Sequence, residues 1–143
     1  MSPSKPSRAS AELLARTLAE RFAPWVREIG LELLEAHDGE VRLRLPVTAP
    51  HVHGGGVLCG QTMMAAADTS MVLAAMTTIG DFRPMTTVQL QTSFLRPVPG
   101  DAGEVAVVAR VLRMGRQLVF GEIEIQDRDG RLVAHATTTY ALL

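Results

Sequence analysis

Asp68 is the residue whose type and position point most clearly to chemistry. It is the only formally charged side chain between Arg44 and Asp81, and it lies in the middle of a long apolar run, 58–79. An isolated carboxylate in such a run is costly unless hydrogen bonds satisfy it or the position serves a purpose. Two interpretations are therefore open. Asp68 is either a structural residue satisfied by backbone amides or a hydroxyl, or a general base or nucleophile.

A glycine-rich loop precedes the apolar run and offers a place for an anionic group. His51 and His53 are followed by three glycines, 54–56, which make the backbone accessible. The start of the following helix would point its amides at a phosphate, a carboxylate or a developing oxyanion. The loop is not a Walker motif, because no Gly-Lys-Ser/Thr follows. A flexible loop with exposed histidines is equally consistent. With no third ligand nearby, we expect no metal site.

Cys59 is a second candidate nucleophile, at the start of the predicted helix. A catalytic cysteine needs a neighbouring base, and His53 is the conceivable one. The apolar surroundings of Cys59 instead favour a small packing residue. The methionines of the same run, among them Met63 and Met64, are most simply core residues that adapt to irregular space.

Composition limits the classes of protein to which the chain can belong. Its 143 residues suit one domain, and a net charge of −1 without a basic stripe argues against a nucleic-acid partner. At 47% hydrophobic and 20% charged, the chain is too apolar for a disordered protein. The single cysteine excludes a disulfide framework and fits a reducing compartment, so we expect a cytoplasmic protein. Prolines and glycines interrupt the uncharged stretch 45–67, which argues against a membrane span.

The hydrophobic patterns predict an α+β domain over residues 10–143, after a flexible tail over residues 1–9. Ser10 is the expected N-cap of a helix that runs toward Gly30 and that Pro24 ends or bends. A long helix over 58–79 ends at Gly80, and Asp38-Gly39 is a strong hairpin signal. The strands of a mainly antiparallel sheet, the last four expected in a meander, are predicted at 31–36, 40–47, 85–95, 103–112, 117–127 and 131–142.

With this order of elements, the chain resembles the hotdog-fold acyl-CoA thioesterases. The resemblance is to the PaaI-like branch, which includes phenylacetyl-CoA and 4-hydroxybenzoyl-CoA thioesterases, and it covers about residues 31–143. It implies a long antiparallel sheet wrapped around one central helix. The matching segments, in order, are Gly56-Val57-Leu58-Cys59-Gly60-Gln61, Ala67-Asp68-Thr69, Met85-Thr86-Thr87-Val88, Phe94-Leu95-Arg96-Pro97, Gly115-Arg116 and Ala134-His135-Ala136-Thr137.

The resemblance also implies catalytic roles for four residues. Asp68 occupies the position of the helix carboxylate that acts as base or nucleophile, and Gly60 that of the amide that polarises the thioester carbonyl. Thr87 stands where a small hydroxyl residue orients the hydrolytic water, and His53 where many members have Asn or Gln. The chain departs from the common His-Gly-Gly at the helix start, where it has Cys59-Gly60-Gln61. The oxyanion amide is retained because it belongs to the backbone.

The implied reaction is hydrolysis of an acyl-CoA thioester, which needs no metal or other cofactor. Coenzyme A enters as part of the substrate. Cys59, Gln61, Met63 and Met64 are candidates for lining the acyl site. Three arginines near strand ends suit the phosphates of coenzyme A, although each is equally consistent with ordinary solvation. They are Arg96, Arg113 and Arg116.

A single sheet around one helix leaves a strand edge, and much of the apolar helix, without a partner. This predicts a homodimer or a dimer of dimers. Two alternatives to hydrolysis are open. One is a hotdog-type dehydratase that pairs His53 with Asp68, and the other is a module that binds acyl-CoA without turnover.

Overall fold

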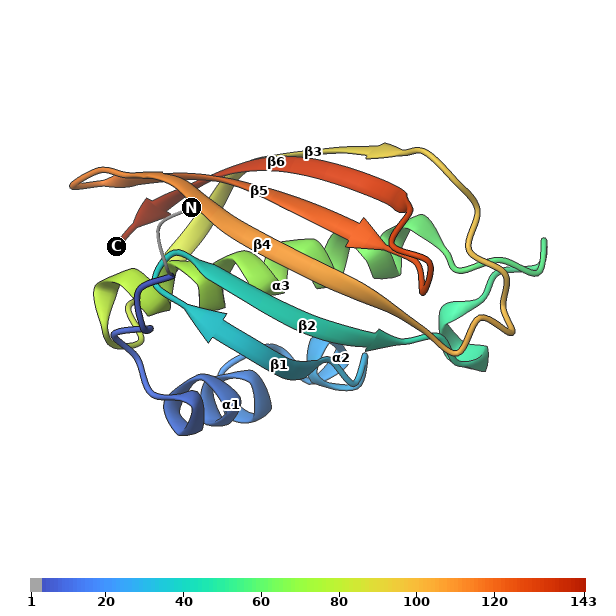
Figure 1. Ribbon diagram of the computed structural model, residues 1–143, viewed down its shortest axis with the longest axis horizontal. Coiled ribbons are helices and arrows are strands. Elements are labelled where there is room, and N and C mark those ends of the chain that lie inside the picture. The colour runs from blue at the N-terminus through green and yellow to red at the C-terminus, as the bar shows by residue number, and fades with distance from the viewer. Residues whose placement is uncertain (1–3) are drawn as a thin grey trace.

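The computed structural model describes residues 4–143, and its centre is the helix α3, Gly60–Ile79. The helix begins two residues later than the predicted start at residue 58, and Cys59 is its N-cap. It begins later because Leu58 still forms a β-bridge with Val52. Gly80 ends the helix in the left-handed conformation, with φ of 97°, as predicted. Among the described residues α3 is the one helix long and apolar enough to cross a membrane, but 72% of its most apolar window is buried inside the domain. It is buried because the sheet wraps around it (Figure 1).

Six antiparallel strands form that sheet, in the order β1-β2-β4-β5-β6-β3. Alternating apolar side chains of the central strands face α3, where Leu43, Val107 and Ile123 are fully buried. The other faces of these strands carry ion pairs such as Arg110 with Glu40. The strands are β1 Glu32–His37, β2 Glu40–Pro46, β3 Met85–Phe94, β4 Glu104–Met114, β5 Leu118–Gln126 and β6 Leu132–Leu142.

The expected meander of the last four strands is wrong in one respect. Only β4, β5 and β6 are consecutive neighbours, whereas β3 crosses to the far side and pairs with β6. β4 can then pair with β2, from Val41 opposite Ala109 to Leu45 opposite Val105. This crossing depends on how the strands are arranged around α3. Turn signals in the sequence do not specify that arrangement. It makes β3 an edge strand.

The N-terminal region forms two helices, α1 Ala11–Glu20 and α2 Pro24–Arg27, rather than one bent helix. Ser10 caps α1 as predicted, since its side chain accepts a hydrogen bond from the Leu13 amide. Pro24 begins α2 instead of ending α1, because a proline is well placed in the first turn of a helix.

The described part of the expected tail contacts the body of the domain. The Arg8 amide donates to the Thr77 carbonyl at 2.7 Å, and the Lys5 carbonyl accepts from the Asp38 amide at 2.9 Å. Ala9 is buried. The chain is therefore attached to the domain from Lys5 onward, while residues 1–3 lie outside the described residues.

Candidate active site

The carboxylate of Asp68 is held by two hydroxyl groups. Thr87 Oγ1, on β3, donates to Asp68 Oδ1 at 2.8 Å. The Tyr140 hydroxyl, on β6, contacts the same Oδ1 and lies 2.5 Å from the Asp68 backbone oxygen. The second carboxylate oxygen, Oδ2, has no donor among the described residues, and the side chain is half-buried. The arrangement thus leaves one carboxylate oxygen free at a partly open position.

Strand register brings these two hydroxyls to the same place. Thr87 pairs directly with Tyr140 across the β3–β6 ladder. The register then shifts between Thr87 and Gln89, so that Val88 forms a bulge, with 61% of its surface exposed. Bulges change the direction of neighbouring side chains and are common beside functional sites.

Tyr140 was missed by the sequence analysis. It is the only tyrosine in the chain and is 2% exposed. Burial, together with the nearby charge and hydrogen bond of Asp68, raises the pKa of the Tyr140 hydroxyl well above its ordinary range, against a smaller opposite effect of Thr87. The hydroxyl is therefore a proton donor at any physiological pH. The available signal was that the chain's one tyrosine lies in a predicted strand, because the hydroxyl of a buried tyrosine usually has a hydrogen-bond partner.

Gly60 lies at the first turn of α3, beside an open apolar pocket of about 330 Å³. The Cys59 side chain does not cap this helix end, so the first amides of α3 have no side-chain acceptor there among the described residues. The Phe94 ring covers Gly60 so closely that a Cβ at this position would lie 3.1 Å from it. The pocket lining is Val57, Leu58, Gly60, Met63, Phe94, Leu95, Arg96 and Pro97.

His53 does not join Asp68 in one protomer. Its ring is exposed and turned back onto its own loop, where Nδ1 accepts from the Gly55 amide at 2.8 Å. The described residues show no hydrogen bond between His53 and Asp68. The neighbouring His51 is buried, with Nδ1 2.7 Å from the Pro46 carbonyl, and holds the loop.

Cys59 makes a local contact, with Sγ 2.9 Å from Thr62 Oγ1 in the first turn of α3. This agrees with a packing role. Gln61, Met64 and Asp68 form a stripe at helical spacing on the least buried face of α3, while Met63 is buried and reaches the pocket beside Gly60.

The three arginines do not converge in one protomer. Arg96 lines the pocket at the end of β3. Arg113 and Arg116 lie at the β4–β5 hairpin, which the ladders place beside the other end of β3, because Leu118 pairs with Ala141 and Leu142 pairs with Met85. All three are exposed. Within one protomer they therefore do not form a single phosphate site. Arg96 is one candidate, and Arg113 with Arg116 is another.

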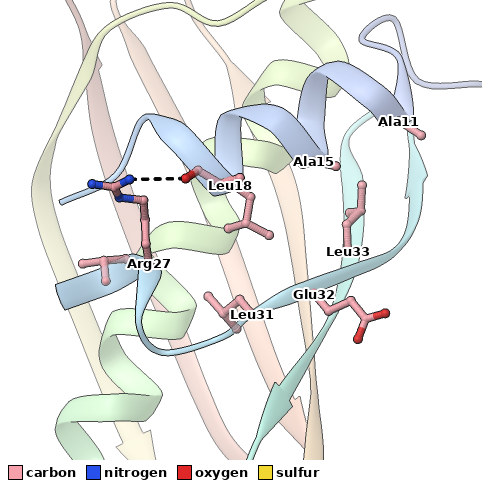
Figure 2. A pocket seen from close by; sticks show the side chains of 9 residues that line it. Ala11, Ala15, Leu18, Arg27, Leu31, Glu32 and Leu33 are labelled. Carbon is pink, nitrogen blue, oxygen red and sulfur yellow. Dashed lines mark hydrogen bonds between the residues drawn. The ribbon is translucent and has the colours of Figure 1, made fainter. Parts of the chain in front are cut away.

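A larger cavity, of about 570 Å³, lies at the opposite edge of the sheet, between α1, α2 and β1. Figure 2 shows mainly apolar side chains around it, with Arg27 donating to the Ala19 carbonyl at 3.5 Å and Glu32 at its border. None of the predicted site residues lines this cavity. The chemistry predicted from the sequence thus belongs to the β3 edge and the start of α3.

Comparison with known proteins finds similar proteins that match over most of the chain. A family model described as the thioesterase superfamily matches residues 50–134. A protein of Saccharolobus solfataricus named "Putative esterase SSO2140" is 30% identical over 115 residues, which cover 80% of each chain. "Putative esterase TV1331" of Thermoplasma volcanium is 28% identical over 82% of this chain and 86% of that protein.

Solved structures match over almost the whole chain. The conserved protein PA5202 of Pseudomonas aeruginosa has a TM-score of 0.80 and 33% identity, covering 90% of this chain and 99% of that one. The thioesterase HI1161 of Haemophilus influenzae (TM-score 0.81, 22% identity, 94% and 90% covered) shares the fold. So does the PaaI protein of the E. coli phenylacetic acid degradation operon (0.75, 20%, 91% and 96%). These matches confirm the predicted hotdog fold.

Proposed function

Because the chain belongs to the thioesterase superfamily, we propose that it hydrolyses an acyl-CoA thioester to the free acid and coenzyme A. The observation that carries the proposal is the half-buried Asp68 carboxylate. It is the lone charge of α3, and two hydroxyls hold it through Oδ1. A carboxylate fixed in this way can take a proton from water or attack a carbonyl carbon directly.

As general base, Asp68 takes one proton from water while the resulting hydroxide attacks the thioester carbonyl. The carbonyl oxygen becomes an oxyanion, and the proposal assigns its stabilisation to a Gly60 amide at the start of an α3 helix. The C–S bond then breaks, the sulfur leaves as the coenzyme A thiol with the proton, and the acid is released. As nucleophile, Asp68 would attack the carbonyl carbon while the C–S bond breaks and coenzyme A leaves as the thiolate. Water would then hydrolyse the resulting acyl anhydride, which releases the acid and a proton and restores the Asp68 carboxylate. The apolar pocket beside Gly60 suits the acyl group.

A complete site would need two chains. Gly60 and Asp68 are eight residues apart on one straight helix, about 12 Å along its axis. A base and an oxyanion donor must each lie within about 3 Å of the reacting group. One thioester therefore cannot contact both on the same α3. Two antiparallel helices related by a two-fold axis would bring Asp68 of one chain to Gly60 of the other.

The exposed edge of β3 supports a homodimer of this kind. β3 pairs on one side only, with β6, and carries exposed apolar side chains at Val88 and Phe94, followed by Leu95. An edge strand without a partner on one side invites association. The expectation of a largely exposed helix needs correction, because most residues of α3 are buried in its own domain. The partly exposed positions are the stripe near Asp68 and the two ends of the helix.

The test is turnover of a panel of acyl-CoAs, measured as release of free thiol, by the wild type and by Asp68→Asn. We expect thiol release by the wild type and a kcat at least about 10²-fold lower for Asp68→Asn. Circular dichroism and the elution volume of the variant serve as the folding control. Near-normal kcat in a folded Asp68→Asn protein would contradict the assignment.

The same panel distinguishes the alternative activities. A change in enoyl absorbance without thiol release would indicate dehydration or hydration. Saturable acyl-CoA binding without either signal would indicate a binding module. The position of His53, turned toward Gly55 and away from Asp68, gives no support to the dehydratase pair within one protomer.

A further inference from the structure

We propose that Tyr140 is a positioning residue of this site, which fixes the Asp68 side chain so that Oδ2 alone is presented to substrate or water. The inference rests on the proposed function, because it assigns a role in turnover to a residue that acts through Asp68. Tyr140 touches no part of the pocket beside Gly60.

The first argument is geometric. A tyrosine hydroxyl has a single proton, and here it is shared between the backbone oxygen and Oδ1 of one residue. A contact to both the main chain and the carboxylate restricts rotation about the side-chain bonds of Asp68. A rigidly oriented base needs no reorganisation when the substrate binds, and small misplacements are costly in rate.

The second argument concerns the two oxygens. Thr87 donates to Oδ1 and so does Tyr140, so two hydroxyls occupy the same oxygen. Hydrogen bonds to a charged acceptor are stronger than neutral ones. They leave the lone pairs of Oδ2 available. The three residues come from α3, β3 and β6, so the orientation is set by the packing of three elements.

A purely structural role for Tyr140 is the competing explanation, and the chain offers a matched control for it. Thr138 lies two residues earlier on the same face of β6, is 4% exposed, and donates to the Gln89 carbonyl of β3 at 2.8 Å. Thr138→Val removes a buried hydroxyl that links β6 to β3 without touching Asp68. Tyr140→Phe removes only the oxygen and keeps the ring packing.

The experiment compares kcat and KM for the wild type, Tyr140→Phe, Thr138→Val and Asp68→Asn with the best acyl-CoA of the panel. We expect Tyr140→Phe to lower kcat about 10- to 100-fold, the worth of one hydrogen bond to a charged group, with KM changed less than about twofold. Thr138→Val should keep the wild-type kcat.

The other possible results show whether the positioning role of Tyr140 fails alone or together with the proposed function. A wild-type kcat in Tyr140→Phe beside an inactive Asp68→Asn would overturn the positioning role alone. An equal loss in Thr138→Val would overturn it as well, because general loosening would then explain both variants. Near-normal turnover by Asp68→Asn would overturn the proposed function together with this inference.

A second measurement does not depend on folding of Tyr140→Phe. The chain has one tyrosine, so fluorotyrosine incorporation gives a single fluorine NMR resonance. Asp68→Asn should shift that resonance clearly, whereas Gln61→Ala, on the exposed face of α3, should leave it in place. An unchanged resonance in Asp68→Asn would show that the hydroxyl does not contact the carboxylate and would overturn the inference.

Discussion

Tyr140 allows the residue-scale electrostatics to be tested directly, since its ionisation alone accounts for tyrosinate absorbance in this chain. Burial and the adjacent Asp68 raise its pKa in the folded protein. A raised pKa favours the protonated form, so this contribution to stability is complete below the ordinary tyrosine value of about 10 and declines as pH rises above it. We predict no tyrosinate in the folded wild type until alkaline unfolding begins, and an earlier onset in Asp68→Asn. Identical ultraviolet titration curves for the two proteins would contradict the coupling.

Gly121 in β5 lies directly against the helix α3, and it gives a prediction at the scale of elements. A Cβ at Gly121 would collide with the Met71 side chain of α3 and lie 2.8 Å from the Arg110 carbonyl of β4. Met71 is fully buried and has little room to move. We predict that Gly121→Ala lowers the free energy of unfolding by about 1–3 kcal/mol, the usual cost of overpacking. Urea unfolding measures it, with Gly54→Ala as the control, because that position has open space. Equal stability of both variants would mean that α3 packs less tightly on β5 than described.

At the scale of the whole molecule, the proposed dimer predicts complementation between two inactive chains. Asp68→Asn removes the carboxylate, and Gly60→Pro removes the amide donor, while Gly60→Ala keeps that donor and controls for crowding against Phe94. Mixed dimers of Asp68→Asn and Gly60→Pro should regain about one working site each, because one pairing of intact halves remains. Light scattering should give twice the chain mass of 15.4 kDa at micromolar concentration. Heterodimers that form and stay inactive, or a stable monomer, would contradict the shared site.

The sequence by itself determined most of the elements and singled out the central residue of the candidate site. Periodicity, the Ser10 cap and the Gly80 stop signal are local, so the start of α1, the helix α3 and the six strands were predictable within a few residues. Asp68 stood out because a single charge in an apolar helix is visible without any structure. The family resemblance assigned separate roles to Asp68 and Thr87, and the structure shows that the two side chains are in contact.

Only the tertiary structure decided which strands are neighbours and what surrounds Asp68. The crossing of β3 to β6 depends on long-range packing around α3, and this crossing places Thr87 opposite Tyr140. No spacing in the sequence links positions 68, 87 and 140. Tyr140 therefore escaped prediction, as did the turn of His53 toward Gly55 and the separation of Arg96 from Arg113 and Arg116. Contacts between distant segments depend on the register of the whole sheet, which local patterns do not encode.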